Sequence, residues 1–169
     1  MDIIKYPDPV LKRGGREVES FDAELAETAK QMMTAMYRFG GVGLAAPQVG
    51  LEVNLLVLNP KGDDTVPDGE MVMVNPKLVY KKGMEWGEEG CLSFPGIYGE
   101  VERYQKIEVE YQDLEGNKHS VRANDFLARV IQHEMDHLDG VLFVERLSPV
   151  DRIRVKSKLL DMEQQYSST

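Results

Sequence analysis

The sequence predicts one compact domain that combines helices with antiparallel strands. The chain has 169 residues and is 42% hydrophobic, which is enough to build a single core. Apolar residues recur at helical spacing near residues 22–39, 126–138 and 149–165, whereas residues 107–121 show the alternation and the turn of a β-hairpin. No repeat or linker interrupts this pattern, so we expect one domain over residues 1–169.

Three helices are expected from the spacing of apolar residues. The first begins at Ser20 or Asp22, either of which suits an N-cap, and ends at Gly40. The second starts at Asn124 or Asp125 and carries the densest group of metal-binding residue types in the chain. The third is expected to be amphipathic, with an apolar face made of Ile153, Val155, Leu159 and Met162.

Several strands are expected before and after the middle of the chain. Residues 53–58 are an apolar run that indicates a buried strand, and the polar residues 59–69 predict a surface loop. Residues 71–74 and 78–80 predict two short strands separated by Asn75-Pro76, and residues 81–89 predict a charged turn. In the hairpin, His119 is flanked by polar residues, which indicates a surface histidine.

Composition narrows the classes of partner. The formal net charge of −9 argues against a broad nucleic-acid surface, so we expect no sequence-specific nucleic-acid partner. No apolar run is long enough to span a bilayer, and residues 1–7 lack the features of a signal peptide, so we expect a cytoplasmic protein with no membrane partner. Cys91 is the only cysteine, which excludes an intramolecular disulfide and fits a reducing compartment.

The second helix carries a candidate metal site. His133 and His137 are four residues apart, so both imidazoles lie on one face of a helix and can bind one cation. Glu134 follows the first histidine and can serve a metal-bound water as a general base and acid. This is the H-E-x-x-H arrangement of metal hydrolases, which recurs in unrelated metallopeptidases.

Two irregular segments hold further candidate residues. The glycine-rich segment 40–50 presents bare backbone and the amide of Gln48, and by itself fits a structural turn as well as a binding role. It lacks the spacing of the known phosphate-binding loops. Cys91 lies between glycine and proline neighbours in residues 89–96, and is either a buried structural thiol or a ligand.

Three motifs occur in one order along the chain: Gly41-Val42-Gly43-Leu44-Ala45-Ala46-Pro47-Gln48, Glu89-Gly90-Cys91-Leu92-Ser93, and Gln132-His133-Glu134-Met135-Asp136-His137-Leu138-Asp139-Gly140. Together they resemble peptide deformylase of the bacterial type, and the likeness extends over nearly the whole chain. The resemblance implies an α+β fold, with antiparallel β-sheets packed around a central metal-binding helix and with N-terminal and C-terminal helices. It also implies a single catalytic domain that removes the N-formyl group from the N-terminal methionine of nascent polypeptides and releases formate.

The resemblance also implies roles for individual residues. Cys91, His133 and His137 would hold one divalent metal ion, with water as the fourth ligand. Fe²⁺ is the metal expected in the cell, and Zn²⁺, Ni²⁺ or Co²⁺ can occupy the site in a preparation. Gln48 and the backbone N–H of Leu92 would share the charge of the oxyanion with the metal, and Glu134 would serve the water. The substrate backbone would pair with Val42-Gly43 and with Glu89-Gly90, the segment before Cys91.

Two other functions and one further partner are weighed against this interpretation. A zincin-like endopeptidase would need a third ligand after His137, where Glu145 and Glu163 are the remaining candidates. A non-catalytic metal domain would need neither Glu134 nor Gln48. An enzyme that acts on emerging chains is also expected to touch the ribosome. A basic run in the last helix could bind ribosomal RNA, or it could be only a solvated helix face. That run consists of Arg152, Arg154, Lys156 and Lys158.

Overall fold

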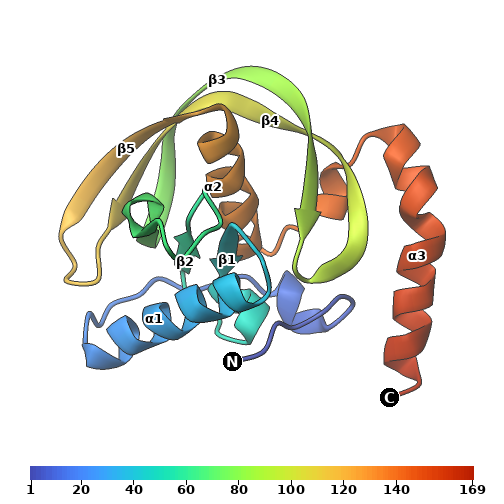
Figure 1. Ribbon diagram of the computed structural model, residues 1–169, viewed down its shortest axis with the longest axis horizontal. Coiled ribbons are helices and arrows are strands. Elements are labelled where there is room, and N and C mark those ends of the chain that lie inside the picture. The colour runs from blue at the N-terminus through green and yellow to red at the C-terminus, as the bar shows by residue number, and fades with distance from the viewer.

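The computed structural model describes residues 1–169 and combines three helices with one antiparallel sheet (Figure 1). The elements are α1 (Ala23–Arg38), β1 (Gly43–Ala45), β2 (Leu55–Leu58), β3 (Met71–Cys91), β4 (Phe94–Gln112), β5 (Lys118–Asn124), α2 (Asp125–Leu138) and α3 (Pro149–Ser167), with one short 3-10 helix before α1 and three more between later elements. The strands follow the order β1-β2-β3-β4-β5, and each neighbouring pair is antiparallel. The predicted α+β class is therefore confirmed, with one continuous sheet where several sheets were expected.

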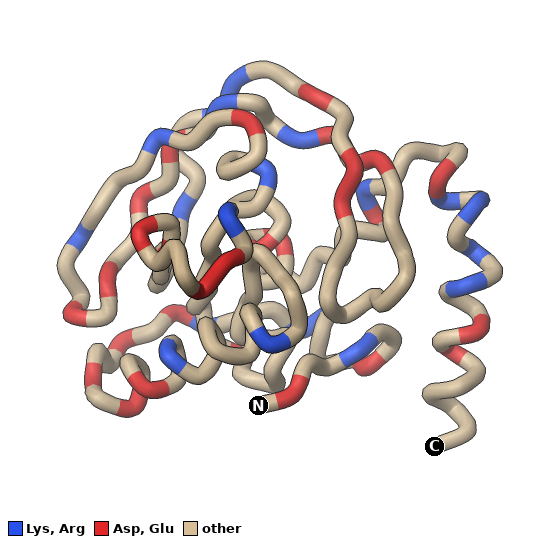
Figure 2. Tube along the Cα trace, viewed as in Figure 1, with Lys and Arg blue, Asp and Glu red and all other residues tan.

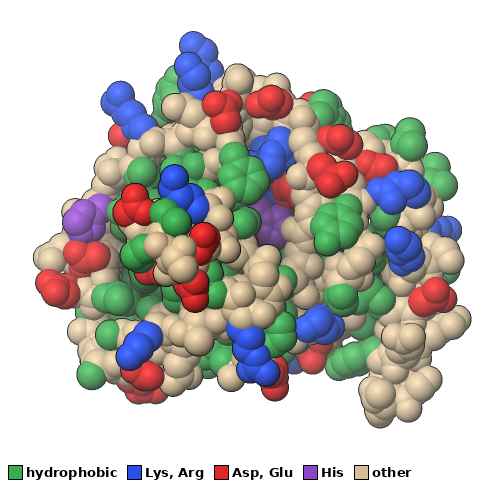
Figure 3. Space-filling model, in the orientation of Figure 1, with side chains coloured by type: hydrophobic (Ala, Val, Ile, Leu, Met, Phe, Trp, Pro, Cys, Tyr) green, Lys and Arg blue, Asp and Glu red, His purple; other side chains and the backbone are tan.

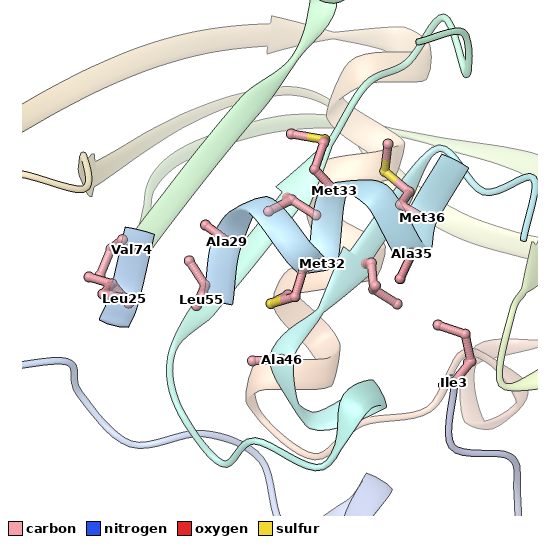
Figure 4. Close-up of a cluster of buried hydrophobic side chains, with 12 residues drawn as sticks. Ile3, Leu25, Ala29, Met32, Met33, Ala35, Met36, Ala46, Leu55 and Val74 are labelled. Atoms are coloured by element: carbon pink, nitrogen blue, oxygen red, sulfur yellow. The ribbon is translucent and has the colours of Figure 1, made fainter. Parts of the chain in front are cut away.

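The apolar run that predicted a buried strand lies between two helices. Leu55 and Val57 of β2 belong to the core cluster built on α1, whereas Leu56 and Leu58 belong to the cluster that includes α2. All four side chains are fully buried, because successive residues of a strand point to opposite faces. Figure 4 shows α1 and its methionines on one side of these strands, with α2 on the other side. A strand covered on both faces needs apolar residues at every position.

Two predictions for residues 71–89 are wrong, because these residues form one long strand, β3. Asn75 adopts a left-handed backbone with a φ of 52°, and the register of β3 against β4 shifts between Val74 and Lys77. The side chain of Asn75 bonds the backbone of Val18 in both directions, at 2.8 and 2.9 Å. Asn75-Pro76 is thus a bulge inside a strand and does not end it.

The charged residues 81–88 belong to a two-stranded ribbon that β3 forms with β4. In Figure 1 the two strands bend together over α2, and few other elements cover this part of the ribbon. Most residues from 79 to 88 are exposed, and apolar alternation is therefore missing from the sequence. This explains why the segment has the composition of a turn although it is a strand.

The helix ends follow the expected capping residues in part. Asp22 is the N-cap of α1, and its carboxylate accepts the N–H of Leu25 at 2.9 Å, so Ser20 is not the cap. In α3, Val155 is fully buried, but Ile153 is 77% exposed, so the predicted apolar face is wrong at that position. The reason is that α3 contacts the rest of the chain along a narrow line at the edge of β4 (Figure 1). None of the helices combines the length and the hydropathy needed to cross a membrane.

Candidate metal centre and cleft

Helix α2 brings two histidines and a glutamate to the base of a cleft. His133, Glu134 and His137 are each at most 8% exposed, because α2 packs against β4 and β1. The two imidazole centroids are 5.2 Å apart, as the four-residue spacing on a helix requires. The predicted pair therefore lies on one buried face.

The end of β3 brings the only cysteine to the same place. The ligand atoms of Cys91, His133 and His137 all lie within 4.8 Å of one another, and Cys91 Sγ is 3.4 Å from His137 Nε2. A thiolate and two neutral imidazoles are a known donor set for a divalent cation with one open position. The third histidine lies elsewhere. The side chain of His119 is 46% exposed and contacts Asp113 at 2.7 Å, so the prediction of a surface histidine is confirmed.

Glu134 has a free carboxylate oxygen inside the cleft. Its Oε1 is buried and has no hydrogen-bond partner in the protein, which leaves it open to a ligand or a water. Burial is the main cause that raises the pKa of Glu134, from its ordinary 4.5 to about 7. Burial, followed by the nearby charges of His133 and Arg103, lowers the pKa of His137 well below its ordinary value. A neutral imidazole is the form that binds a metal ion.

Behind His133 lies a buried network of charged side chains that the sequence analysis did not identify. The Glu89 carboxylate contacts His133 Nδ1 at 2.8 Å and accepts two bonds from Arg103, at 2.9 and 3.0 Å. Arg129 donates a further bond to Glu89 at 2.8 Å, and Arg103 also pairs with Asp136 at 2.6 Å. Burial opposes ionisation of Glu89, but the bonds from His133 and Arg103 outweigh it, so its pKa lies well below the ordinary value.

From the sequence, Glu89 was predicted to contact the substrate, whereas in the structure its carboxylate contacts His133. Glu89 lines the cleft, but its carboxylate contacts Nδ1 of His133, the ring nitrogen that a metal-binding histidine can use for an outer partner. Such a contact fixes the tautomer and the orientation of a metal-binding histidine. No local signal distinguishes these roles, because Arg103 is 14 residues from Glu89 and His133 is 44 residues away.

Gln48 lies beside Cys91 and is almost fully buried. Its Nε2 is 3.5 Å from Cys91 Sγ and 3.1 Å from Ser93 Oγ, while its Oε1 accepts the N–H of Ala45 at 3.0 Å. These contacts fix which end of the amide faces the cysteine, so the donor end is directed at the site. Leu92 follows in the tight turn between β3 and β4 and also lines the cleft.

The glycines of the first motif allow the backbone to approach the site closely. A Cβ atom added to Gly43 would lie 2.5 Å from Glu134 Oε2, and one added to Gly41 would lie 2.7 Å from Leu92 Cδ1. A side chain at Gly43 would displace Glu134, and one at Gly41 would move the end of the Leu92 side chain, so the segment 41–43 lies close to both α2 and the turn after Cys91. The close approach places residues 41–43 and Gln48 in the lining of the cleft, where their backbone and amide groups are available to a ligand.

These parts surround one cleft of about 510 Å³. In Figure 3 a histidine is visible at the bottom of a hollow, between hydrophobic side chains. Val42, Gly43, Glu89 and Gly90 all line it, so the structure brings together every residue predicted to contact the substrate. Three exposed aromatic residues of the lining were not identified from the sequence: Phe39, Tyr98 and Phe126.

The chain is similar in sequence to known deformylases. The profile of the family described as polypeptide deformylase matches residues 1–153. The chain is 42% identical over 171 residues to peptide deformylase 1B, chloroplastic, of Oryza sativa subsp. japonica, an alignment that covers 100% of this chain and 63% of that protein. It is 41% identical over 167 residues to peptide deformylase of Helicobacter pylori (strain HPAG1), covering 98% of this chain and 96% of that protein. The chain spans only 60–63% of the length of three plant relatives.

Solved structures show the same likeness in three dimensions. A crystal structure of peptide deformylase from Plasmodium falciparum superimposes with a TM-score of 0.96 at 38% sequence identity. That superposition covers 99% of this chain and 98% of the other chain. The bend of the β3–β4 ribbon over α2 is therefore an arrangement that solved proteins share.

Proposed function

This chain belongs to the polypeptide deformylase family, and we propose that it hydrolyses the N-formyl group from the N-terminal methionine of newly synthesised polypeptides, releasing formate. The observation that carries the proposal is the convergence of Cys91, His133 and His137 at the base of a cleft, beside the free carboxylate oxygen of Glu134. A water and an amide carbonyl can both be placed there, next to a base and a hydrogen-bond donor.

Cys91, His133 and His137 would hold one divalent metal ion. When bound, such an ion lowers the pKa of a coordinated water from about 15.7 toward ~7 and polarises a carbonyl oxygen. The chemistry of the donor set supports a cation, since soft thiolate and imidazole ligands suit Fe²⁺, Zn²⁺, Ni²⁺ and Co²⁺ alike. We propose that Fe²⁺ occupies the site in the cell and that the other metals occupy it in some preparations. Metal analysis of protein purified without oxygen tests this, and a site filled with zinc would contradict it.

Glu134 would move the proton. Its free Oε1 lies in the cleft, so it can accept a proton from the attacking water and return it to the departing amine nitrogen. A pKa raised toward neutrality by burial suits both halves of this task, because the group must accept and then release a proton near pH 7. Gly43 leaves the space that the carboxylate occupies.

Gln48 and Leu92 would stabilise the oxyanion that forms when water attacks the formyl carbon. The Gln48 amide is oriented toward Cys91 by its bond from Ala45, and the backbone N–H of Leu92 follows in the same turn. A donor of this kind, placed in advance, is typically worth ~3–4 kcal/mol in the transition state. The loop that leads to Gln48 passes close to Leu92, since a Cβ added to Gly41 would lie 2.7 Å from Leu92 Cδ1.

The substrate peptide would bind as an added strand. β1 has β2 on one side only, and residues 42–43 and 89–90 all line the cleft. Main-chain hydrogen bonds to Val42-Gly43 and Glu89-Gly90 would hold the peptide without regard to its sequence. Apolar lining residues such as Val130 and Leu92 suit a methionine side chain. A narrow base would favour the small formyl group over acetyl.

Two alternative functions receive less support. An endopeptidase of the zincin type would use a ligand after His137, but the Glu145 side chain accepts the N–H of Leu142 and Glu163 contacts Tyr6. A non-catalytic metal domain would need neither the free oxygen of Glu134 nor the oriented amide of Gln48.

Place and partners are also part of the proposal. The substrate implies the cytoplasm of a cell that starts translation with formylmethionine, where a single cysteine stays reduced. A transient ribosome contact through α3 is supported by the exposure of its four basic side chains at positions 152, 154, 156 and 158. Co-sedimentation of the Lys156→Glu variant with ribosomes tests that contact, and unchanged binding would count against it.

The decisive experiment compares Glu134→Ala with the parent protein at equal metal content. Formate release from a formyl-Met tripeptide and cleavage of an internal peptide bond are measured side by side. We expect the parent to release formate only, and the variant to lose at least ~100-fold in rate, because general acid–base catalysis contributes about 10²–10⁴-fold. Undiminished formate release by the variant would remove Glu134 from the mechanism.

A further inference from the structure

One edge of β4 has no strand beside it next to the cleft. β3 pairs with β4 along most of its length, but β5 pairs only with the residues from Lys106 to Gln112. Apart from an isolated antiparallel bridge between Val101 and Leu147, residues 94–101 therefore have no strand on their other side. An open edge exposes a row of backbone groups that need partners, and proteins usually cover such a row.

Helix α3 and the residue before it cover this edge with hydrogen-bond donors. Residues 96, 98 and 100 are alternate residues of the strand, so their carbonyl oxygens point to the same edge. Lys158 Nζ donates to Gly96 O at 3.3 Å, and Arg154 Nη2 donates to Tyr98 O. The N–H of Ser148 donates to Glu100 O at 2.9 Å.

An acceptor completes the pattern at the start of α3. Asp151 Oδ2 accepts the N–H of Glu100 at 2.7 Å, and Asp151 also pairs with Arg154 at 3.0 Å. Gly99 permits this contact, because a Cβ there would lie 2.6 Å from Leu147 and 3.2 Å from Asp151. The segment 148–158 thus supplies the donors and the acceptor that a neighbouring strand would supply.

The covered segment is also a wall of the cleft. Pro95, Gly96 and Tyr98 line the cleft, and they directly follow the turn that carries Cys91 and Leu92. One side of this short segment therefore faces the substrate while its free edge is held by α3. A displacement of that edge would therefore move this wall of the cleft.

We propose that Arg154 and Lys158 are positioning residues, which hold the cleft wall 95–98 in place for the peptide residues that follow the methionine. The proposal rests on the proposed deformylase function and deepens it. It also gives the basic run of α3 a role inside the protein. Figure 2 shows that α3 carries several basic positions in its first half. Among them Lys156 makes no hydrogen bond or ion pair, which makes it a matched control.

The first test measures backbone protection and does not depend on activity. The double variant Arg154→Met, Lys158→Met keeps the apolar stems of both side chains but removes their donors, and Lys156→Met is the control. We expect amide hydrogen exchange in residues 94–101 to become about fivefold faster in the double variant, from the loss of hydrogen bonds at the edge. Exchange in α1 should stay unchanged. Equal exchange in the double variant and the control would overturn the proposal.

The second test separates positioning from overall stability. For a formyl-Met tripeptide, we expect the double variant to raise KM about fivefold with little change in kcat, while formyl-Met-amide, which lacks the residues that follow the methionine, shows no change. The single variant Lys158→Arg should keep the KM of the parent, because it keeps a donor at this position. A lower Tm with both substrates unaffected would show a purely structural role and overturn the proposal. If the parent protein releases no formate, the proposed function fails, and the exchange result still decides whether α3 holds the wall.

Discussion

Replacing Glu89 by glutamine tests whether the buried charge network supports the metal site. The side chain of Glu89 is 5% exposed and contacts His133, Arg103 and Arg129. Glutamine has nearly the same shape, but its amide group places donors against the guanidinium donors of the two arginines. Breaking a buried ion pair by removing one partner costs ~3–5 kcal/mol. Arg103 keeps its bond to Asp136 at 2.6 Å, so we expect the lower end, about 3 kcal/mol.

The measurement is thermal unfolding of metal-free protein at pH 7, with Glu88→Gln as the control. Glu88 is the exposed neighbour of Glu89 and forms no ion pair. For a chain of this size, about 3 kcal/mol corresponds to a Tm lower by ~6–12 °C. Metal affinity, measured separately by titration, should fall ~10–100-fold, because His133 loses its outer partner.

The pH dependence gives an independent check. The folded pKa of Glu89 lies below its ordinary value of 4.5, so its contribution to stability is present above pH 4.5 and is lost as the pH falls through the folded pKa. The difference between the parent and Glu89→Gln should therefore narrow below pH 4.5. A loss of less than about 1 kcal/mol at pH 7, or a loss equal to that of the control, would refute the reasoning.

Three further predictions follow from single contacts. Gly43→Ala should lower kcat at least ~10-fold in formate release, because the new methyl group displaces Glu134; an unchanged kcat would contradict the packing. Leu55→Ala should cost ~2–5 kcal/mol in urea unfolding, while Ile153→Ala, at an exposed site, should stay within about 0.5 kcal/mol. Tyr6→Phe should remove the step at the highest pH from an ultraviolet titration of the tyrosines, since burial and Glu163 raise the pKa of Tyr6 to about 12. The neutral phenol stabilises the fold, and this stabilisation is lost as the pH rises through that value. A titration curve unchanged by Tyr6→Phe would contradict this assignment.

Elements with a strong local pattern were predictable from the sequence. α1 begins at its capping aspartate, β2 is the buried apolar run, and the hairpin of β4 and β5 follows its alternation. The H-E-x-x-H spacing placed His133 and His137 on one helical face because helix geometry is local. Prediction failed for segments whose residue pattern depends on which distant parts of the chain pack against them. The charged half of β3 has the composition of a turn because its surroundings are mostly solvent.

The sequence by itself determined the residue types of the metal site and the helix that carries two of them. Only the tertiary structure decided how far the third donor lies from the histidines, which oxygen of Glu134 is free, and what holds His133 from behind. It also placed two exposed side chains of the basic run, Arg154 and Lys158, on carbonyl groups of β4. The physical reason is one of range: helix spacing and capping act over a few residues, whereas the contacts of Glu89, Gln48 and Arg154 join segments separated by dozens of residues.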